Sequence, residues 1–252
     1  MTIERLRRFN LVMGALHLVS GLLMVILGND FSLPVSTLNL NGPPGTPLSD
    51  GTVEDVMNVP LAWGTASFLL LSALFHFMVA SPAGFPLYRR ELMAGRNRFR
   101  WVEYALSSTL MIVLIAMVTG VTDLAALIAI AFVNASMILF GWLMEVANPP
   151  NKPVWWTPFW FGCIAGVGPW AAIFGYLIVN ISQPNAGQPP GFVYGILITI
   201  FVAFNCFAIN QWLQYRRKGK WSDYLYGERI YVVLSLVAKS LLAWQIFANT
   251  LI

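Results

Sequence analysis

The stretch Tyr231-Val-Val-Leu-Ser-Leu-Val-Ala-Lys239-Ser-Leu-Leu-Ala-Trp244 is an apolar run with one lysine in its middle. If this segment begins near Arg229, Lys239 lies roughly 15 Å along a helix, about half of a ~30 Å hydrocarbon core. An ammonium group at that depth is energetically expensive and is rare without a function. One chemistry that uses such an amine is imine formation with the carbonyl group of a ligand.

The composition of the chain indicates that most of it lies in lipid. Of its 252 residues, 58% are hydrophobic and only 10% are charged, which is far less charge than a soluble domain carries. The length suits a single domain over residues 1–252. Two cysteines, Cys163 and Cys206, lie in apolar segments and predict neither a disulfide framework nor a metal site.

Seven apolar stretches have the length that a membrane-spanning helix needs. They cover residues 9–28, 59–80, 98–119, 123–145, 156–179, 192–215 and 229–251. The first follows basic residues, as in a signal peptide, but no small-x-small cleavage site follows it, so we expect a retained helix. The sequence therefore predicts an all-α membrane protein built as a bundle of seven transmembrane helices.

One connection, residues 29–58, is much longer than the others. It contains Asn39-Leu-Asn-Gly-Pro-Pro-Gly-Thr46, which is dense in turn-forming residues. A connection of this length tends to have its own structure or a partner. We expect a short β-hairpin that covers the bundle or a second subunit; a disordered loop is the alternative.

The basic residues are distributed very unevenly between the two ends of the predicted bundle. With seven spans, fourteen of the fifteen lysines and arginines fall on one side, and the fifteenth is Lys239. The other side carries acidic residues only. By the positive-inside rule we expect a multi-pass protein of the cell membrane with a cytoplasmic N-terminus and an extracellular C-terminus. This placement accounts for the net charge of +4 without a nucleic-acid partner.

Glu103 is the one acidic residue well inside a predicted span, so we expect it opposite Lys239, because a buried charge needs a partner. Ser235 lies one turn before Lys239, and Ser107 lies one turn after Glu103, so both hydroxyls share a helix face with a buried charge. The spans are also rich in aromatic side chains, which would hold a flat conjugated ligand or simply fill the bundle. These are Trp101, Tyr104, Trp142, Trp160, Trp170, Phe204 and Trp244.

Several long stretches of the chain resemble those of the heliorhodopsins, an inverted-topology family of microbial rhodopsins, and the match extends over nearly the whole chain. The stretches are Asn41-Gly-Pro-Pro-Gly-Thr46, Leu74-Phe-His-Phe77, Phe99-Arg-Trp-Val-Glu-Tyr104, Val133-Asn-Ala-Ser-Met-Ile-Leu-Phe-Gly-Trp142, Pro158-Phe-Trp-Phe-Gly-Cys-Ile-Ala-Gly166, Gly191-Phe-Val-Tyr-Gly195 and Leu234-Ser-Leu-Val-Ala-Lys-Ser240.

The resemblance implies that Lys239 binds all-trans retinal as a protonated Schiff base and that Glu103 is its counterion. It implies a hydrated polar network on the cytoplasmic side of the Schiff base, made of His17, His76, Ser20, Ser72, Tyr104, Arg100 and Asn134. We expect Arg100 inside the protein, below the counterion. Packing is the alternative role for the two histidines. The resemblance also implies a homodimer, and a signalling role would need a cytoplasmic partner.

For the wall of the chromophore pocket we add six residues from the later spans: Met137, Gly141, Trp160, Phe204, Gln211 and Trp244. Met137 and Gly141 have simple helix packing as the alternative role.

The expected function is light sensing and signalling, without enzyme activity. Proton-pumping relatives have a second carboxylate one turn before the lysine, where this chain has Ser235, and another farther along the third span, near Leu114. The nearest alternative is a light-driven pump or a light-gated channel. A lysine-dependent membrane enzyme or a transporter is a more distant alternative, and a structural protein with an incidental lysine is the least favoured.

Overall fold

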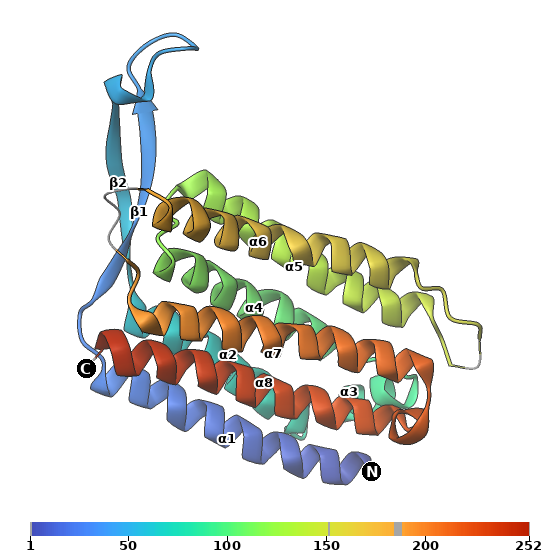
Figure 1. The fold of residues 1–252 in the computed structure, drawn as a ribbon. Coiled ribbons are helices and arrows are strands. Elements are labelled where there is room, and N and C mark those ends of the chain that lie inside the picture. Colours follow the sequence, from blue (N-terminus) through green and yellow to red (C-terminus); the bar gives the residue numbers. More distant parts are fainter. Residues whose placement is uncertain (1, 151, 184–187, 252) are drawn as a thin grey trace.

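The computed structural model describes residues 2–150, 152–183 and 188–251. Within these ranges seven helices are long and apolar enough to cross a membrane. They are α1 (Ile3–Leu27), α2 (Leu61–Ala80), α4 (Arg98–Val118), α5 (Leu124–Ala147), α6 (Thr157–Ile181), α7 (Gly191–Arg216) and α8 (Tyr224–Ile246), the last continued by a π-helical turn, Phe247–Leu251. The predicted seven-helix bundle is therefore confirmed (Figure 1).

The seven helices form a closed ring in the order α1, α2, α4, α5, α6, α7, α8, with α8 packed against α1. The seam between α6 and α7 is much less extensive than that between α5 and α6. Helix α1 begins six residues earlier than the apolar run starts, because the Thr2 side chain caps it by accepting a hydrogen bond from the Arg5 backbone N–H at 3.2 Å.

The long connection forms the expected hairpin. Strands β1 (Ser32–Leu40) and β2 (Gly51–Pro60) pair antiparallel, with a bulge between Val35 and Ser36. At the base of the hairpin, Val35 is buried in the core, and Ser36 donates to Thr122 through its backbone N–H (2.8 Å) and its hydroxyl (2.9 Å). Beyond this base the hairpin projects away from the bundle (Figure 1). It therefore does not cover the bundle, and of the two expected roles only the covering of a second subunit stays a prediction.

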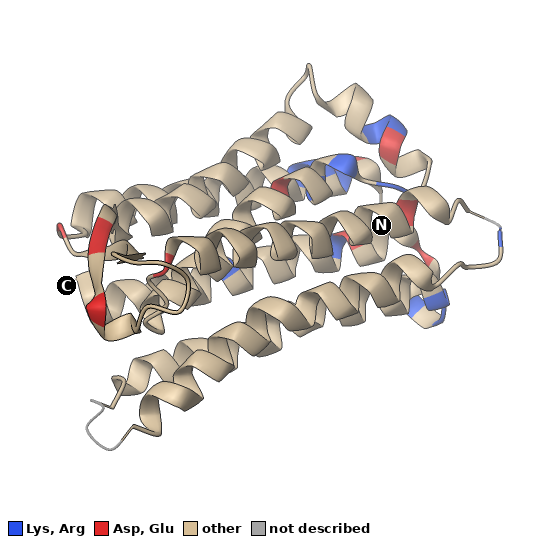
Figure 2. Ribbon diagram, turned by 90° about the horizontal axis from the view of Figure 1, so that it is seen from above, with Lys and Arg blue, Asp and Glu red and all other residues tan. Residues whose placement is uncertain are grey.

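A short helix that we did not predict, α3 (Phe85–Met93), follows α2 at the end opposite the hairpin. Its buried Glu91 forms ion pairs with Arg98 (2.7 Å) and Arg96 (3.3 Å). The pKa of Glu91 lies below its usual value, mainly because Arg98 donates a hydrogen bond to the carboxylate. Lysines and arginines gather at this end, whereas the hairpin end carries acidic residues and, among the described residues, no basic one, as the charge pattern predicts (Figure 2). We refer to the two ends as the basic end and the hairpin end.

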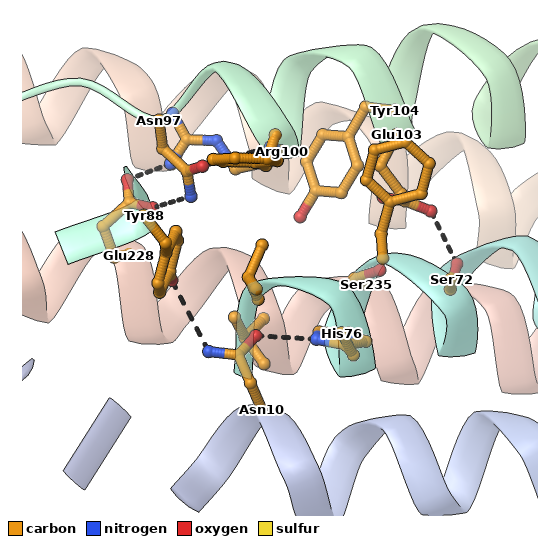
Figure 3. A pocket seen from close by; sticks show the side chains of 14 residues that line it. Asn10, Ser72, His76, Tyr88, Asn97, Arg100, Glu103, Tyr104, Glu228 and Ser235 are labelled. Carbon is orange, nitrogen blue, oxygen red and sulfur yellow. Dashed lines mark hydrogen bonds and ion pairs between the residues drawn. The ribbon is translucent and has the colours of Figure 1, made fainter. Parts of the chain in front are cut away.

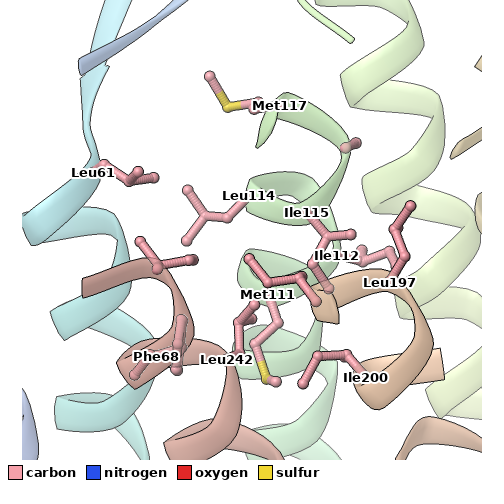
Figure 4. Close-up of a cluster of buried hydrophobic side chains, with 14 of the residues drawn as sticks. Leu61, Phe68, Met111, Ile112, Leu114, Ile115, Met117, Leu197, Ile200 and Leu242 are labelled. Carbon is pink, nitrogen blue, oxygen red and sulfur yellow. The ribbon is translucent and has the colours of Figure 1, made fainter. Parts of the chain in front are cut away.

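The two halves of the bundle interior differ in polarity. Toward the hairpin end, aliphatic side chains from α2, α4, α7 and α8 pack into one cluster (Figure 4). Leu114, Ile115, Ile200 and Leu242 are almost completely buried there. Among the described residues, the buried carboxylates, the buried His17 and the buried Arg100 lie no farther from the basic end than about the middle of their helices, the level of Lys239.

The turn into α3 provides a test of the fold. A Cβ atom on Gly84 would lie 2.1 Å from the backbone oxygen of Met78, so Gly84→Ala forces the turn to move. We expect a loss of about 1–3 kcal/mol, typical of overpacking, and a lower unfolding temperature in detergent, followed by tryptophan fluorescence. Gly175→Ala is the matched control, because no atom lies within 4 Å of its added Cβ. An unchanged midpoint for Gly84→Ala would contradict the geometry of this turn.

Candidate functional site

Lys239 and Glu103 form a buried ion pair between α8 and α4. The Lys239 Nζ donates to the Glu103 Oε1 at 2.7 Å and to the Ser235 hydroxyl at 2.9 Å. The two charged side chains are only 4% and 7% exposed. The Ser72 hydroxyl of α2 donates to the same carboxylate oxygen at 2.6 Å (Figure 3). One ammonium, one carboxylate and two hydroxyls therefore form a locally neutral unit in the middle of the bundle.

This pair can form because α4 carries Arg100 into the protein. Helix α4 begins at Arg98, where the Asn97 side chain caps it by accepting from the Arg100 backbone N–H. Glu103 is thus only in the second turn of α4, close to the basic end. Arg100 is nevertheless buried, as predicted, so the helix enters the bundle before Glu103 is reached.

Lys239 borders a large cavity of about 520 Å³, enclosed by α4, α5, α6, α7 and α8. The wall of the cavity is mostly apolar and aromatic. The side chains that define its shape include Trp101, Tyr104, Met111, Met137, Phe159, Trp170, Phe201, Phe204, Phe207 and Tyr231. An elongated apolar ligand could lie here with one end at the Lys239 amine.

Most of the residues expected for a chromophore pocket line this cavity, namely Ser107, Met137, Gly141, Phe204, Gln211 and Ser235. Trp160 and Trp244 do not. Their side chains are 57% and 38% exposed, because they lie on outer faces of α6 and α8. A residue in a helix that borders the cavity lines the wall only if its side chain lies on the inward face of that helix.

Gly141 has a specific role in shaping the cavity. A Cβ atom there would lie 2.4 Å from Cζ3 of Trp101, so only glycine allows the indole ring to pack against α5. The carbonyl group of Gly141 accepts a hydrogen bond from the Gln211 side chain at 3.0 Å, which ties α7 to α5 across the cavity.

The two histidines lie together at the level of the ion pair. Their rings stack with centroids 5.5 Å apart. His76 Nδ1 lies 2.7 Å from the side-chain oxygen of Asn10, while both ring nitrogens of the fully buried His17 lack a partner within the described residues. Of the other residues expected in this network, Ser72 contacts Glu103 and Tyr104 donates its hydroxyl to the Tyr231 carbonyl group at 2.9 Å.

Two residues expected in the polar network do not border the small cavity beside His76. Asn134 of α5 donates to the hydroxyls of Ser108 and Thr109, both at 3.0 Å, and does not border the cavity next to His76. Ser20 on α1 is half-buried and is likewise absent from the wall of that cavity. Asn134 is thus directed at α4 and not at the histidines, whereas Ser20 shares the α1 helix face of His17, about one turn farther along the chain.

Arg100 lies at the centre of a second buried charge cluster, which the sequence did not reveal. Its guanidinium group donates to Glu145 of α5 and to Glu228 of α8. It also stacks on Tyr231, with 3.8 Å between the guanidinium carbon and the ring centroid. The two carboxylates seemed to belong to the membrane surface, because each stands near the end of an apolar run. The signal that could have identified them is Arg100 itself, since a buried arginine requires acidic partners.

This cluster also yields a stability test. Arg100→Gln leaves two buried carboxylates without their cation, so we expect a loss of about 3–5 kcal/mol. Arg98→Gln is the matched control, because the Arg98 side chain is 43% exposed and its partner Glu91 keeps a second ion pair with Arg96, so the loss should be smaller. Thermal unfolding in detergent should separate the two variants clearly. Equal midpoints would contradict the burial of the Arg100 cluster.

Comparison with solved structures shows a similar fold. The chain superposes on the crystal structure of a light-driven proton pump, LR (Mac), from Leptosphaeria maculans with a TM-score of 0.63 and 14% sequence identity. The match covers 96% of this chain and 94% of the fungal chain. At this identity the likeness shows a common fold and nothing about activity. A search of curated proteins found no match.

Comparison with protein families gives a more specific result. The family model described as Heliorhodopsin matches residues 6–251, which is almost the whole chain and includes Lys239, Glu103 and all seven spanning helices. The chain therefore belongs to the heliorhodopsin family and is a retinal-binding, light-responsive membrane protein.

Proposed function

We propose that this protein is a light sensor that holds all-trans retinal as an imine at Lys239, with Glu103 as the counterion. The observation that carries the proposal is the Lys239–Glu103 contact of 2.7 Å at the edge of the 520 Å³ apolar cavity. The ammonium nitrogen of Lys239 stands in for the protonated imine nitrogen.

The cavity fits such a ligand in both size and chemistry. Ligand pockets in proteins usually measure about 300–1,000 Å³ and have mostly apolar walls with a few polar groups. Here Lys239 and the Ser235 hydroxyl, 2.9 Å apart, supply polar groups at one place in the wall, while Trp170, Phe201 and Phe204 lie in its apolar part. This distribution suits a polyene whose single polar atom is at the lysine end.

The residues around Lys239 are suited to holding and releasing a proton. When bound, retinal supplies light absorption and a change of shape at the nitrogen of Lys239. In the dark, the ionised Glu103 stabilises a positive charge on that nitrogen, and Ser72 fixes the orientation of the carboxylate. Once the contact between the nitrogen and Glu103 is broken, the proton can leave toward the polar groups near His76.

The asymmetry of the interior favours sensing over pumping. Vectorial transport needs proton-binding groups on both sides of the lysine. The aliphatic cluster around Leu114 fills the hairpin half of the bundle, and Ser235 stands one turn before Lys239 (Figure 4). The alternative is a light-driven proton pump, the activity of the fungal protein with the similar fold. The absence of a second carboxylate near Lys239 speaks less strongly against a light-gated channel than against a pump.

Three further features belong to this proposal. We propose a cytoplasmic N-terminus, because the basic residues gather at that end of the bundle. A homodimer and a cytoplasmic signalling partner, rather than an enzymatic activity, complete the proposed sensor. The projecting hairpin and the exposed basic connections are the parts of the surface suited to such contacts.

The first test is pigment formation. Purified protein should acquire a visible absorption band with all-trans retinal, and Lys239→Ala should not, because no amine remains to form the imine. Glu103→Gln should shift the maximum to longer wavelength when recorded in acid, because the counterion no longer stabilises charge at the nitrogen. Glu91→Gln is the control, because this carboxylate is outside the cavity and should leave the maximum unchanged. Parent protein that stays colourless would favour a membrane enzyme or transporter.

The second test concerns transport. Illuminated cells or vesicles that contain the pigment should give no sustained change of external pH, because the hairpin half of the bundle offers no proton path. A sustained change that an uncoupler abolishes would overturn the sensing proposal in favour of a pump. The fungal proton pump, measured in parallel, provides the positive control.

A further inference from the structure

The cluster around Arg100 carries a surplus of negative charge inside the protein. One guanidinium group contacts two carboxylates, Glu145 and Glu228, and the three side chains are at most 5% exposed. Within the described parts of the chain, no second lysine or arginine forms an ion pair with either carboxylate. With both acids ionised, the cluster has a net charge of −1, which is costly in a buried position. It is therefore suited to bind one proton.

The two carboxylates are stabilised to different extents. Glu145 accepts hydrogen bonds from three donors: Arg100, the Tyr224 hydroxyl (3.1 Å) and the Asn97 backbone N–H (2.8 Å). Glu228 accepts from two donors, Arg100 and the Asn97 side chain (2.7 Å). Hydrogen bonds donated to a carboxylate favour its ionised form. Glu145 thus has one donor more than Glu228, and the two carboxylates differ further in which of them a proton could reach.

Glu228 also faces the ion pair at Lys239. A cavity of about 40 Å³ is bordered by Glu228 and Arg100 at one end and by Glu103, Ser72 and Ser235 at the other (Figure 3). Glu145 does not border it. The volume has room for about two or three water molecules, which could link the polar groups along its wall. Asn10 and His76 lie along this route, joined by a hydrogen bond of 2.7 Å.

We infer that Glu228 takes up the proton that leaves the nitrogen of Lys239 after illumination. The inference rests on the proposed function. The N–H bond at position 239 breaks, the proton crosses the small cavity through water, and an O–H bond forms on Glu228. No electrons are exchanged. The surplus negative charge moves from the Arg100 cluster to Glu103, where the Ser72 hydroxyl still donates at 2.6 Å.

Proton uptake by Glu228 would also affect the surface of the protein. A neutral Glu228 attracts the Arg100 guanidinium less strongly. The ion pair that connects α4 with the beginning of α8 is therefore weakened. This part of α8 follows the connection between α7 and α8, where Lys218, Lys220 and Arg217 are exposed. Arg100 and Glu145 remain as a neutral pair, so the rest of the cluster stays intact. The proton could thus carry the light signal to the basic end of the molecule.

The test is light-minus-dark infrared spectroscopy of the retinal-loaded protein. We expect the carbonyl band of a protonated carboxylic acid to appear in the light and to shift in deuterium oxide. The band should be lost in Glu228→Gln and displaced in frequency in Glu228→Asp. It should persist in Glu91→Gln, the matched control, in which a buried carboxylate outside the cavity and outside the Arg100 cluster is neutralised.

The outcomes separate this inference from the proposed function. Failure of the parent protein to form a pigment would remove the proposed function itself. If the pigment forms and its nitrogen loses the proton in the light, but no carboxylic acid band appears, the inference is wrong. A band that survives in Glu228→Gln, or that depends on Glu145 alone, also overturns it. If Glu228→Gln does not fold, Glu228→Asp decides, because an unmoved band excludes Glu228 as the acceptor.

Discussion

A buried ammonium group next to a buried carboxylate, 2.7 Å apart, is the interaction on which the rest of the site depends. Neither charge is tolerable alone, because an unpaired ion inside a protein costs several kcal/mol. Lys239 on α8 and Glu103 on α4 must therefore face each other across the bundle. Their pairing fixes the rotation of both helices, and with it the faces that border the large cavity.

The position of Glu103 has a further consequence. It lies only in the second turn of α4, so the helix must bring Arg100 into the interior as well. A buried guanidinium needs its own anions, and Glu145 and Glu228 supply them. The second charge cluster is thus a structural result of the first. Together the two clusters concentrate polar groups in the basic half of the bundle, while aliphatic side chains fill the other half.

The difference between the polar half and the apolar half of the interior bears on whether the protein senses light or transports protons. Polar groups and a small cavity lie between Lys239 and the basic end, whereas a close-packed and mainly apolar cluster lies toward the hairpin. Water and ions enter such packing at high cost. This packing is the structural basis on which we propose sensing instead of transport across the membrane.

The sequence by itself determined the seven spans, the ends at which basic and acidic residues gather, and the single lysine and carboxylate that had to meet. These depend on composition and on the cost of charge in lipid, which act on each segment separately. The tertiary structure decided which face of each helix points inward. It excluded Trp160 and Trp244 from the cavity wall, separated Asn134 from the histidines, and brought Glu145 and Glu228 to Arg100. The two contacts of Arg100 join residues 45 and 128 positions apart, and they depend on helix rotation and packing, which no single segment encodes.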